Sequence, residues 1–302
     1  MREPLARISV VVPSCNSSRT LVSTLDGLLS LEGNDLAEIL VVDSSDDGMM
    51  PPVVERYRRR GVRFLDAGRR VMPAIGRNLG AKEAVGNVLA FIDADAYPET
   101  DWGVRIAENH RSGKLAGGGS VLLPEWQEGL PVAVAQYYLQ FNESLPDPSG
   151  RQETRPFLPS VNLYCDRSLF ERAGGFPEIR AGEDTLFGIR LSRIAPIWFD
   201  PGIRVRHIFR DRVDDFCRNQ RMLGHYNLVF RRTEYGSAIY RGRIPALLSP
   251  AITILKGMRI VSRVAGAGNG HLARLATGFP LFARGLAAWG AGFASASSGA
   301  AP

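Results

Sequence analysis

Short apolar runs alternate with amphipathic stretches through the N-terminal third of the chain, and this alternation limits the fold more than any other feature. The runs Ile8–Val12, Ile39–Val42 and Val88–Ile92 are rich in β-branched residues, as expected of strands buried on both faces of a parallel sheet. Between the first two, Leu21–Leu29 carries leucines at helical spacing. The pattern predicts βα units on a mostly parallel sheet flanked by helices, which is an α/β fold.

The composition is that of an ordinary globular protein. The chain has 302 residues, of which 45% are hydrophobic and 23% charged, which excludes a disordered or collagen-like chain. Cys15, Cys165 and Cys217 are far apart and odd in number, so they fit a reducing compartment better than a disulfide framework or a zinc site. The first apolar run is too short for a secretory signal. We therefore expect a cytoplasmic location.

Charge divides the sequence into an acidic front and a basic tail. From residue 201 onward there are 15 Lys and Arg against four acids. The apolar blocks Ile244–Leu255 and Leu272–Phe293 are interrupted by prolines or arginines, so neither provides the ~20 uninterrupted apolar residues of a spanning helix. Both fit helices in a membrane interface, with arginines facing anionic headgroups and Leu, Phe and Trp289 facing the acyl chains. The alternative is two amphipathic helices packed on the rest of the protein.

An Asp-x-Asp pair follows one of the predicted strands. Asp93 and Asp95 come directly after Val88–Ile92, and alternation along an extended segment would point both side chains the same way. Two converging carboxylates repel each other unless a cation lies beside them. Mg²⁺ or Mn²⁺ would supply that charge, and the alternative is a solvated acidic turn. Asp43 ends an earlier strand, so these acids are expected at the carboxyl edge of the sheet, where open α/β sheets bind ligands.

A second pair of acids begins a predicted helix. Glu183 and Asp184 follow Gly182, and the helix dipole alone favours acids in a first turn. Arg190 lies about two turns further along the same side, where it can orient a carboxylate. The residues therefore allow either a structural or a catalytic role for these acids.

Six short segments occur in order along the chain, and together they resemble those of the family-2 glycosyltransferases. The segments are Val10–Asn16, Val41–Gly48, Gly76–Gly80, Asp93–Asp95, Gly174–Phe176 and Gly182–Asp184. The likeness covers roughly Ile8 to Gly224. It implies a GT-A fold and an inverting transfer from a nucleotide sugar, with a UDP-sugar as the default donor and GDP and dTDP sugars as alternatives.

The resemblance also implies where the donor binds. Arg77 matches a position near the diphosphate, and Asp93 would face the ribose, followed by Ala94. Cys15 stands where the family usually has an aromatic residue. The nucleotide would lie against Pro13, Cys15, Asn16, Asp43 and Asp46, with Asp47 as the alternative to Asp46.

The reacting groups are implied in the same way. Asp95 would ligate Mg²⁺ or Mn²⁺, and His207 stands at a position from which a histidine of related enzymes reaches the metal or the diphosphate. Asp184 corresponds to the general base, with Glu183 beside it. Arg221 lies where many relatives have a motif that closes over the diphosphate.

Other readings of the same residues fit less well. A phosphatase of the haloacid-dehalogenase type carries its Asp-x-Asp on the first strand, not on about the fourth. A dinucleotide-binding enzyme needs G-x-G-x-x-G after the first strand, and Ser14–Thr20 contains no glycine; a nucleotidyltransferase needs a Gly-rich loop at the same place. The basic tail contains no recognised nucleic-acid module, so no nucleic-acid partner is expected.

We therefore expect an inverting, metal-dependent glycosyltransferase with a GT-A catalytic domain over residues 1–225. Residues 226–302 are expected to form a basic helical region that associates with an anionic membrane surface at its cytoplasmic face. Such a region favours a lipid-linked or envelope-glycan acceptor. The alternative is a membrane-bound scaffold or binding protein that kept the fold and lost the chemistry.

Overall fold

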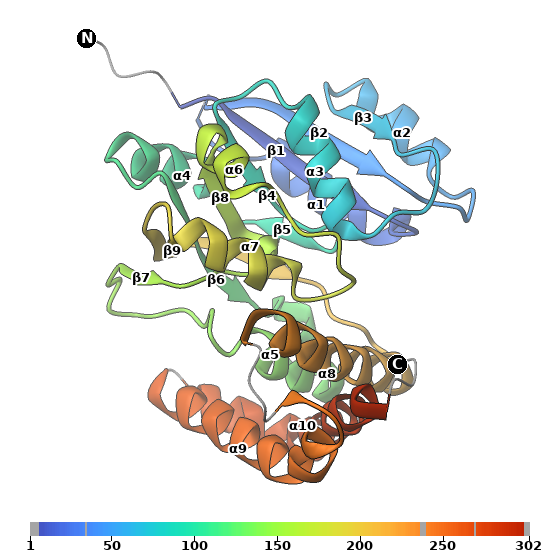
Figure 1. Ribbon diagram of the computed structural model, residues 1–302. Helices are drawn as coiled ribbons and strands as arrows, with labels where there is room; N and C mark the ends of the chain where they lie inside the picture. Colours follow the sequence, from blue (N-terminus) through green and yellow to red (C-terminus); the bar gives the residue numbers. More distant parts are fainter. Residues whose placement is uncertain (1–5, 34, 236–239, 269, 299–302) are drawn as a thin grey trace. The chain divides into compact units, whose positions relative to one another are not determined.

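The computed structural model describes residues 6–33, 35–235, 240–268 and 270–298 (Figure 1). Its packing divides the chain into two compact units. We call Met1–Leu122 with Pro146–His207 the sheet unit, and Leu123–Leu145 with Ile208–Pro302 the helical unit. The predicted boundary after residue 225 falls inside a helix, α8 (Val213–Tyr235), and the assignment of a catalytic domain to residues 1–225 stays a prediction.

Within the described residues, nine strands form the sheet of the sheet unit, in the order β3-β2-β1-β4-β8-β6-β9-β5, with β7 beside β9. Strands β3, β2, β1 and β4 are parallel, as the apolar runs predict, and the α/β fold is confirmed. β8 is antiparallel to β4 and to β6, and β9 is parallel to β6. The strands are β1 (Ile8–Ser14), β2 (Leu36–Asp43), β3 (Arg63–Asp66), β4 (Val88–Phe91), β5 (Ala96–Pro98), β6 (Ala116–Leu122), β7 (Glu153–Arg155), β8 (Leu163–Asp166) and β9 (Ile197–His207).

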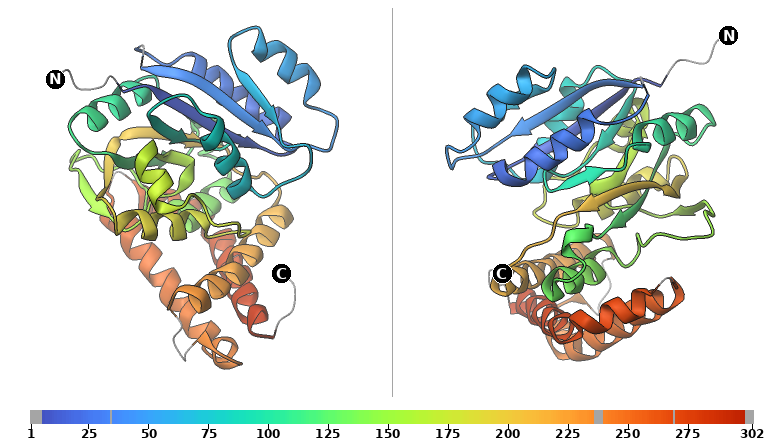
Figure 2. Two further views of the ribbon diagram at one scale, coloured as in Figure 1. Left: turned by 45° about the horizontal axis from the view of Figure 1, so that its top comes forward. Right: turned by 180° about the vertical axis from the view of Figure 1, so that it is seen from behind.

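Helices cover both faces of this sheet. In Figure 1, α3, α6 and α7 lie in front of it, and their apolar side chains form a buried cluster with those of β1, β4 and β8. Seen from behind, α1 lies in front of the sheet instead (Figure 2). The helices of this unit are α1 (Ser18–Leu29), α2 (Pro51–Arg58), α3 (Pro73–Glu83), α4 (Trp102–Arg111), α6 (Arg167–Ala173) and α7 (Glu183–Ser192).

The helical unit contains α5 (Pro131–Phe141), α8, α9 (Ile244–Gly266) and α10 (His271–Ser295). A buried apolar cluster joins these helices, with Tyr138 and Phe216 at full burial. Glycines let the helix axes approach closely: a Cβ on Gly285 of α10 would lie 2.1 Å from the Phe216 ring and 2.8 Å from Leu139.

The predicted apolar blocks at the C-terminus form two continuous helices. α9 has 23 residues and keeps Pro250 inside it, so it is long and apolar enough to cross a membrane by length and composition. α9 is longer than the predicted block Ile244–Leu255, and Lys256, Arg259 and Arg263 interrupt its apolar residues, so it has no run of ~20 uninterrupted apolar residues. Pro245 does not break the helix because it lies in the first turn, where its missing N–H has no partner to lose.

The expectation that the Trp289 side chain faces the acyl chains of a membrane is wrong. Its side chain is buried, with 5% exposed, and its ring stacks on Phe293 at 5.3 Å between centroids. α10 packs most of its large apolar side chains inside the helical unit, among them Leu275 and Phe282. For α10, packing within the protein is what the structure shows.

Candidate active site

The carboxyl ends of three parallel strands bring the predicted donor-binding residues to one edge of the sheet. In register, Ser14 pairs with Asp43, and Val11 pairs with Phe91, so β1, β2 and β4 end side by side. Asp93 follows β4 by two residues. This is the edge at which open α/β sheets bind ligands.

The loops after β1 and β2 are tied together by side chains. The Asn16 amide donates to Asp46 Oδ1 at 2.7 Å, and the Asp46 N–H donates to Asn16 Oδ1 at 3.0 Å. Asn16 has φ 52°, a left-handed conformation that asparagine tolerates. The Ser45 hydroxyl donates to Asp43 Oδ1 at 2.7 Å and accepts the Asn16 N–H at 2.8 Å. The predicted residues Asn16, Asp43 and Asp46 therefore form one hydrogen-bonded surface.

Pro13 and Cys15 belong to the same surface. Pro13 lies at the end of β1, where a Cβ on Gly76 of α3 would be 3.2 Å from its side chain. The Cys15 thiol is part-exposed and lies 3.7 Å from the carbonyl oxygen of Ser44. The position where the family usually has an aromatic ring is thus a small side chain beside the loop after β2.

Asp93 and Asp95 converge through a turn rather than along a strand. β4 ends at Phe91, and the Ala96 N–H donates to the Asp93 carbonyl at 3.1 Å before β5 begins. Ala94, between them, is buried with 6% exposed. The expectation that the two carboxylates point the same way because of strand alternation is wrong in its reason, although the carboxylates do lie close together.

A histidine completes this group. β9 pairs with β5 so that His207 lies opposite Ala96, and His207 Nε2 is 3.4 Å from Asp95 Oδ1. Ligand atoms of Asp93, Asp95 and His207 all lie within 4.8 Å of one another. Two carboxylate oxygens and an imidazole nitrogen fit a divalent ion.

Arg77 is the buried centre of the site. Its side chain is 3% exposed, and it donates to Asp93 Oδ1 at 2.6 Å and to Glu183 Oε1 at 3.0 Å. Its guanidinium carbon lies 5.4 Å from the centre of the Phe176 ring. Because a buried cation needs paired charges, the two acids hold Arg77 in place and Arg77 holds them. Its predicted place near the diphosphate stays a prediction; the structure shows its two ion pairs, to Asp93 and Glu183.

Small residues and one amide position Arg77. A Cβ on Gly80 would be 2.3 Å from Val11 Cγ1, so α3 lies against β1 only because this residue is glycine. Asn78 donates to the Phe176 carbonyl at 2.8 Å and accepts the Phe176 N–H at 2.9 Å. These contacts explain why Gly76–Gly80 and Gly174–Phe176 occur as a pair of motifs: each fixes the other.

The acids of α7 lie at its first turn. Gly182 precedes them with φ 86°, a conformation that costs glycine nothing. Burial raises the pKa of Glu183 to about 7, an effect that Asp184 increases and Arg77 opposes. Burial also raises the pKa of Asp184, against the influence of Arg77 and of the N–H groups of Thr185 and Ser160.

Arg190, which we expected to orient these acids, is not the arginine that binds Glu183. Arg190 is exposed, whereas Glu183 is paired with Arg77, 106 residues earlier in the chain. The segment Gly76–Gly80 places an arginine among small residues, on the face of a helix that packs against a sheet. This pattern indicates that the arginine is buried and needs an acidic partner.

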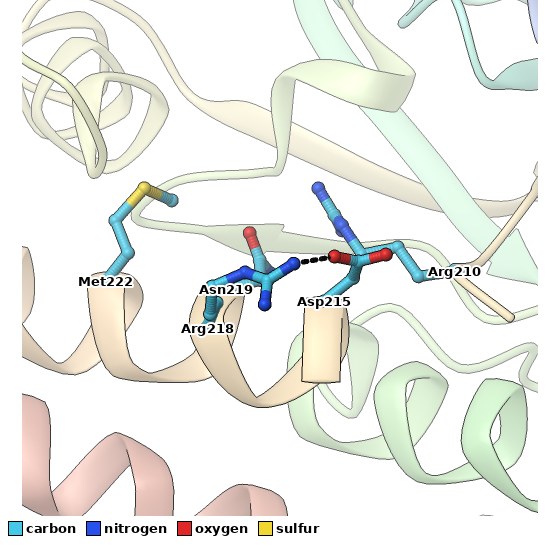
Figure 3. A pocket seen from close by; sticks show the side chains of 5 residues that line it. All are labelled: Arg210, Asp215, Arg218, Asn219 and Met222. Carbon is cyan, nitrogen blue, oxygen red and sulfur yellow. Dashed lines mark hydrogen bonds and ion pairs between the residues drawn. The ribbon is translucent and has the colours of Figure 1, made fainter. Parts of the chain in front are cut away.

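Arg221 belongs to the helical unit, on α8, where its side chain is exposed. A pocket of about 310 Å³ lies beside the same helix. It is lined by Arg210, Asp215, Arg218, Asn219 and Met222, with Arg218 paired to Asp215 (Figure 3). Arg221 is not among these residues. Its role over the diphosphate stays a prediction.

The parallel strands and the acids at their carboxyl ends define an α/β protein of the open-sheet, ligand-binding type. The family model "Glycosyl transferase family 2" matches residues 9–162, half of the chain. The chain therefore belongs to glycosyltransferase family 2, as its motifs predict.

One curated relative and several solved structures are similar to this chain. The uncharacterized glycosyltransferase EpsJ of Bacillus subtilis is 29% identical over 202 residues, which are 62% of this chain and 56% of that relative. The match thus spans little more than half of that relative's length. Mannosyltransferase PcManGT of Pyrobaculum calidifontis, in complex with GDP-Man and Mn²⁺, covers 94% of this chain and 86% of its own at 20% identity and a TM-score of 0.58.

Two further structures agree on the fold. TarS of S. aureus, residues 1–349 in complex with UDP-GlcNAc, covers 97% of this chain and 92% of its own, with 16% identity and a TM-score of 0.55. GalNAc-T7 with UDP, GalNAc and Mn²⁺ covers 69% of this chain and 45% of its own, with 18% identity and a TM-score of 0.55.

Proposed function

We propose that this glycosyltransferase moves a sugar from a nucleotide diphosphate sugar to a hydroxyl group in one inverting displacement. One observation carries the proposal: Arg77 joins Asp93, in the group that can hold a metal, to Glu183, the neighbour of Asp184. A displacement needs a site for the leaving group and a base for the attacking group. Arg77 would keep these two parts of the site at a fixed distance from each other.

The nucleotide would lie against the loops after β1 and β2, on Pro13, Cys15, Asn16, Asp43 and Asp46. Their mutual hydrogen bonds support this assignment, because a surface that is already ordered loses little entropy when a ligand binds. The similar structures hold UDP-GlcNAc in one case and GDP-Man in another. UDP is our default donor nucleotide, with GDP and dTDP as alternatives.

Asp95 and His207 would hold the divalent ion, and Asp93 adds a carboxylate whose other contact is Arg77. A bound ion of this kind stabilises the negative charge that grows on a diphosphate leaving group. Arg77 orients Asp93 and neutralises part of the charge of three neighbouring carboxylates, those of Asp93, Glu183 and Asp184. We assign Arg77 this positioning role in place of a direct contact with the diphosphate.

Asp184 is the proposed general base. As the acceptor oxygen attacks the anomeric carbon, the acceptor proton passes to Asp184, and the bond from that carbon to the diphosphate oxygen breaks with its electron pair going to the diphosphate. Burial raises the pKa of Asp184, which makes its carboxylate a stronger base than a solvated aspartate. Glu183 would hold Arg77 beside it.

The acceptor and location are proposed from the C-terminal part of the chain. Its basic charge supports a lipid-linked or envelope-glycan acceptor. We place the enzyme in the cytoplasm, since none of its three cysteines forms a disulfide.

Calorimetric titration of UDP, GDP and dTDP into the purified chain tests the donor site. With Mn²⁺ present, we expect one nucleotide to bind at least about tenfold more tightly than the others, and EDTA to abolish that difference. If no nucleotide binds with or without Mn²⁺, the proposal is wrong and the chain is a scaffold that kept the fold.

A further inference from the structure

Helix α9 buries one face against the protein and leaves the opposite face apolar and uncovered. The buried face includes Gly257, Ile260 and Val264. The Ser249 hydroxyl on this face donates to the Gly290 carbonyl of α10 at 2.7 Å, and a Cβ on Gly257 would be 2.6 Å from Leu286. This face is therefore committed to packing within the helical unit.

The opposite face carries large apolar side chains that the described residues leave exposed. We call this set the apolar stripe: Leu247 (79% exposed), Leu248 (39%), Ile254 (61%), Leu255 (63%) and Met258 (63%). Leu247 and Leu248 lie seven residues, about two helical turns, before Ile254 and Leu255, and Met258 lies four residues after Ile254, so the five side chains share one side of the helix. Scattered single apolar side chains need no explanation, but a contiguous row of them marks an interaction surface.

The charge around the stripe has one sign. From residue 236 to the end, the sequence carries seven Lys and Arg and no Asp or Glu. Arg243 and Arg259, both exposed, adjoin the stripe near its two ends. A surface with this pairing of apolar and cationic side chains complements an anionic lipid headgroup layer over acyl chains.

We propose that α9 lies in the plane of an anionic membrane surface, with the apolar stripe inserted at the boundary between headgroups and acyl chains. Spanning is disfavoured because the other face of α9 is occupied by α10. A second copy of this chain is disfavoured because it would bring the arginines of two stripes together. The inference does not depend on the proposed reaction.

Vesicle flotation tests this surface with the full chain. Vesicles of phosphatidylglycerol and phosphatidylethanolamine are compared with vesicles of phosphatidylcholine at physiological salt. We expect the chain to float with the anionic vesicles and to stay in the bottom fraction when the vesicles are neutral. The double variant Leu255→Gln with Met258→Gln should bind the anionic vesicles about tenfold more weakly, since each of these side chains loses its apolar burial in the bilayer.

A matched control removes two exposed apolar side chains from the sheet unit: Val85→Gln with Leu115→Gln, at 57% and 38% exposure. It should float like the unchanged chain. Thermal unfolding of both double variants should match that of the unchanged chain, which shows that a loss of flotation is not a loss of fold.

Four results would overturn the proposal. They are equal flotation of the two double variants, equal binding to neutral and anionic vesicles, retention in the membrane after alkaline carbonate extraction (a spanning helix), and a dimer in light scattering that the Leu255 and Met258 changes dissolve (a second copy on the stripe).

Discussion

Arg77 lies at the centre of the candidate site because a buried guanidinium must find charged partners, and Asp93 and Glu183 supply them. The motif predicts that Arg77 belongs to the site. The ion pair of the Arg77 side chain with Glu183 could not be predicted, since Glu183 lies 106 residues away in the chain. Only the packing of the sheet unit brings the two residues together. Local patterns identify residues of this kind more readily than they identify partners.

Replacing Arg77 with alanine should destabilise the protein strongly. Arg77→Ala leaves Asp93 and Glu183 without their cation in a buried place, so we expect the free energy of unfolding to fall by about 3–5 kcal/mol. Urea unfolding measures it. Arg58→Ala, an exposed arginine on α2, is the control and should change the value by less than ~0.5 kcal/mol. Equal effects of the two changes would contradict the buried ion pairs.

Glu183 should make stability depend on pH. Burial raises its pKa to about 7 from an ordinary value of 4.5, so the folded state binds this proton more tightly than the unfolded chain does. The stabilisation from this group is full below about pH 4.5 and is lost as the pH rises through about 7. Between pH 5 and 8, the unchanged chain should lose about 2–3 kcal/mol of unfolding free energy relative to Glu183→Gln. Parallel urea curves with no pH-dependent gap would refute the raised pKa.

Some strands of the sheet could be predicted from the sequence, and others could not. β1, β2 and β4 were predictable because each is a continuous apolar run, buried on both faces. β5, β8 and β9 were not, because their pairing depends on contacts far apart in the sequence, such as Ala96 with His207. The turn that brings Asp93 and Asp95 together was missed for the same reason: the sequence pattern alone favoured an extended strand.

Gly80 sets the distance between α3 and β1. Gly80→Ala would place a methyl group 2.3 Å from Val11 Cγ1, so we expect a loss of about 1–3 kcal/mol in unfolding free energy. Gly129→Ala is the matched control, since nothing lies within 4 Å of its Cβ position, and it should be neutral or stabilise by up to about 1 kcal/mol. Chemical denaturation of the two variants decides. A neutral Gly80→Ala would mean that α3 can move away from β1.

On the scale of the whole molecule, the helical unit takes α5 from the middle of the chain and α8 to α10 from its end. The sequence indicates apolar helices at the C-terminus but not that α5 packs against them. A Cβ on Gly278 of α10 would lie 2.8 Å from the Pro131 carbonyl, and the Tyr138 hydroxyl lies 3.0 Å from His271 Nδ1. α5 is therefore packed against α10.

Shortening the chain to residues 1–225 should consequently impair folding. The cut ends α8 early and removes α9 and α10, which leaves Tyr138 and Phe216 without their cover. We expect a fragment that binds a hydrophobic dye and has no cooperative thermal transition in this unit. Calorimetry of the fragment beside the full chain tests this. A sharp transition without dye binding would instead support residues 1–225 as an independent domain.

In the proposed mechanism, donor binding depends on Asp95 and the ion that it would hold, whereas proton transfer depends on Asp184. The most direct measurement is calorimetry of the donor nucleotide with Mn²⁺, on the unchanged chain, on Asp95→Asn and on Asp184→Asn. We predict that Asp95→Asn weakens metal-dependent binding by at least about tenfold and that Asp184→Asn binds within about twofold of the unchanged chain while sugar transfer is lost. Loss of nucleotide binding in Asp184→Asn, or full binding in Asp95→Asn, would contradict this division.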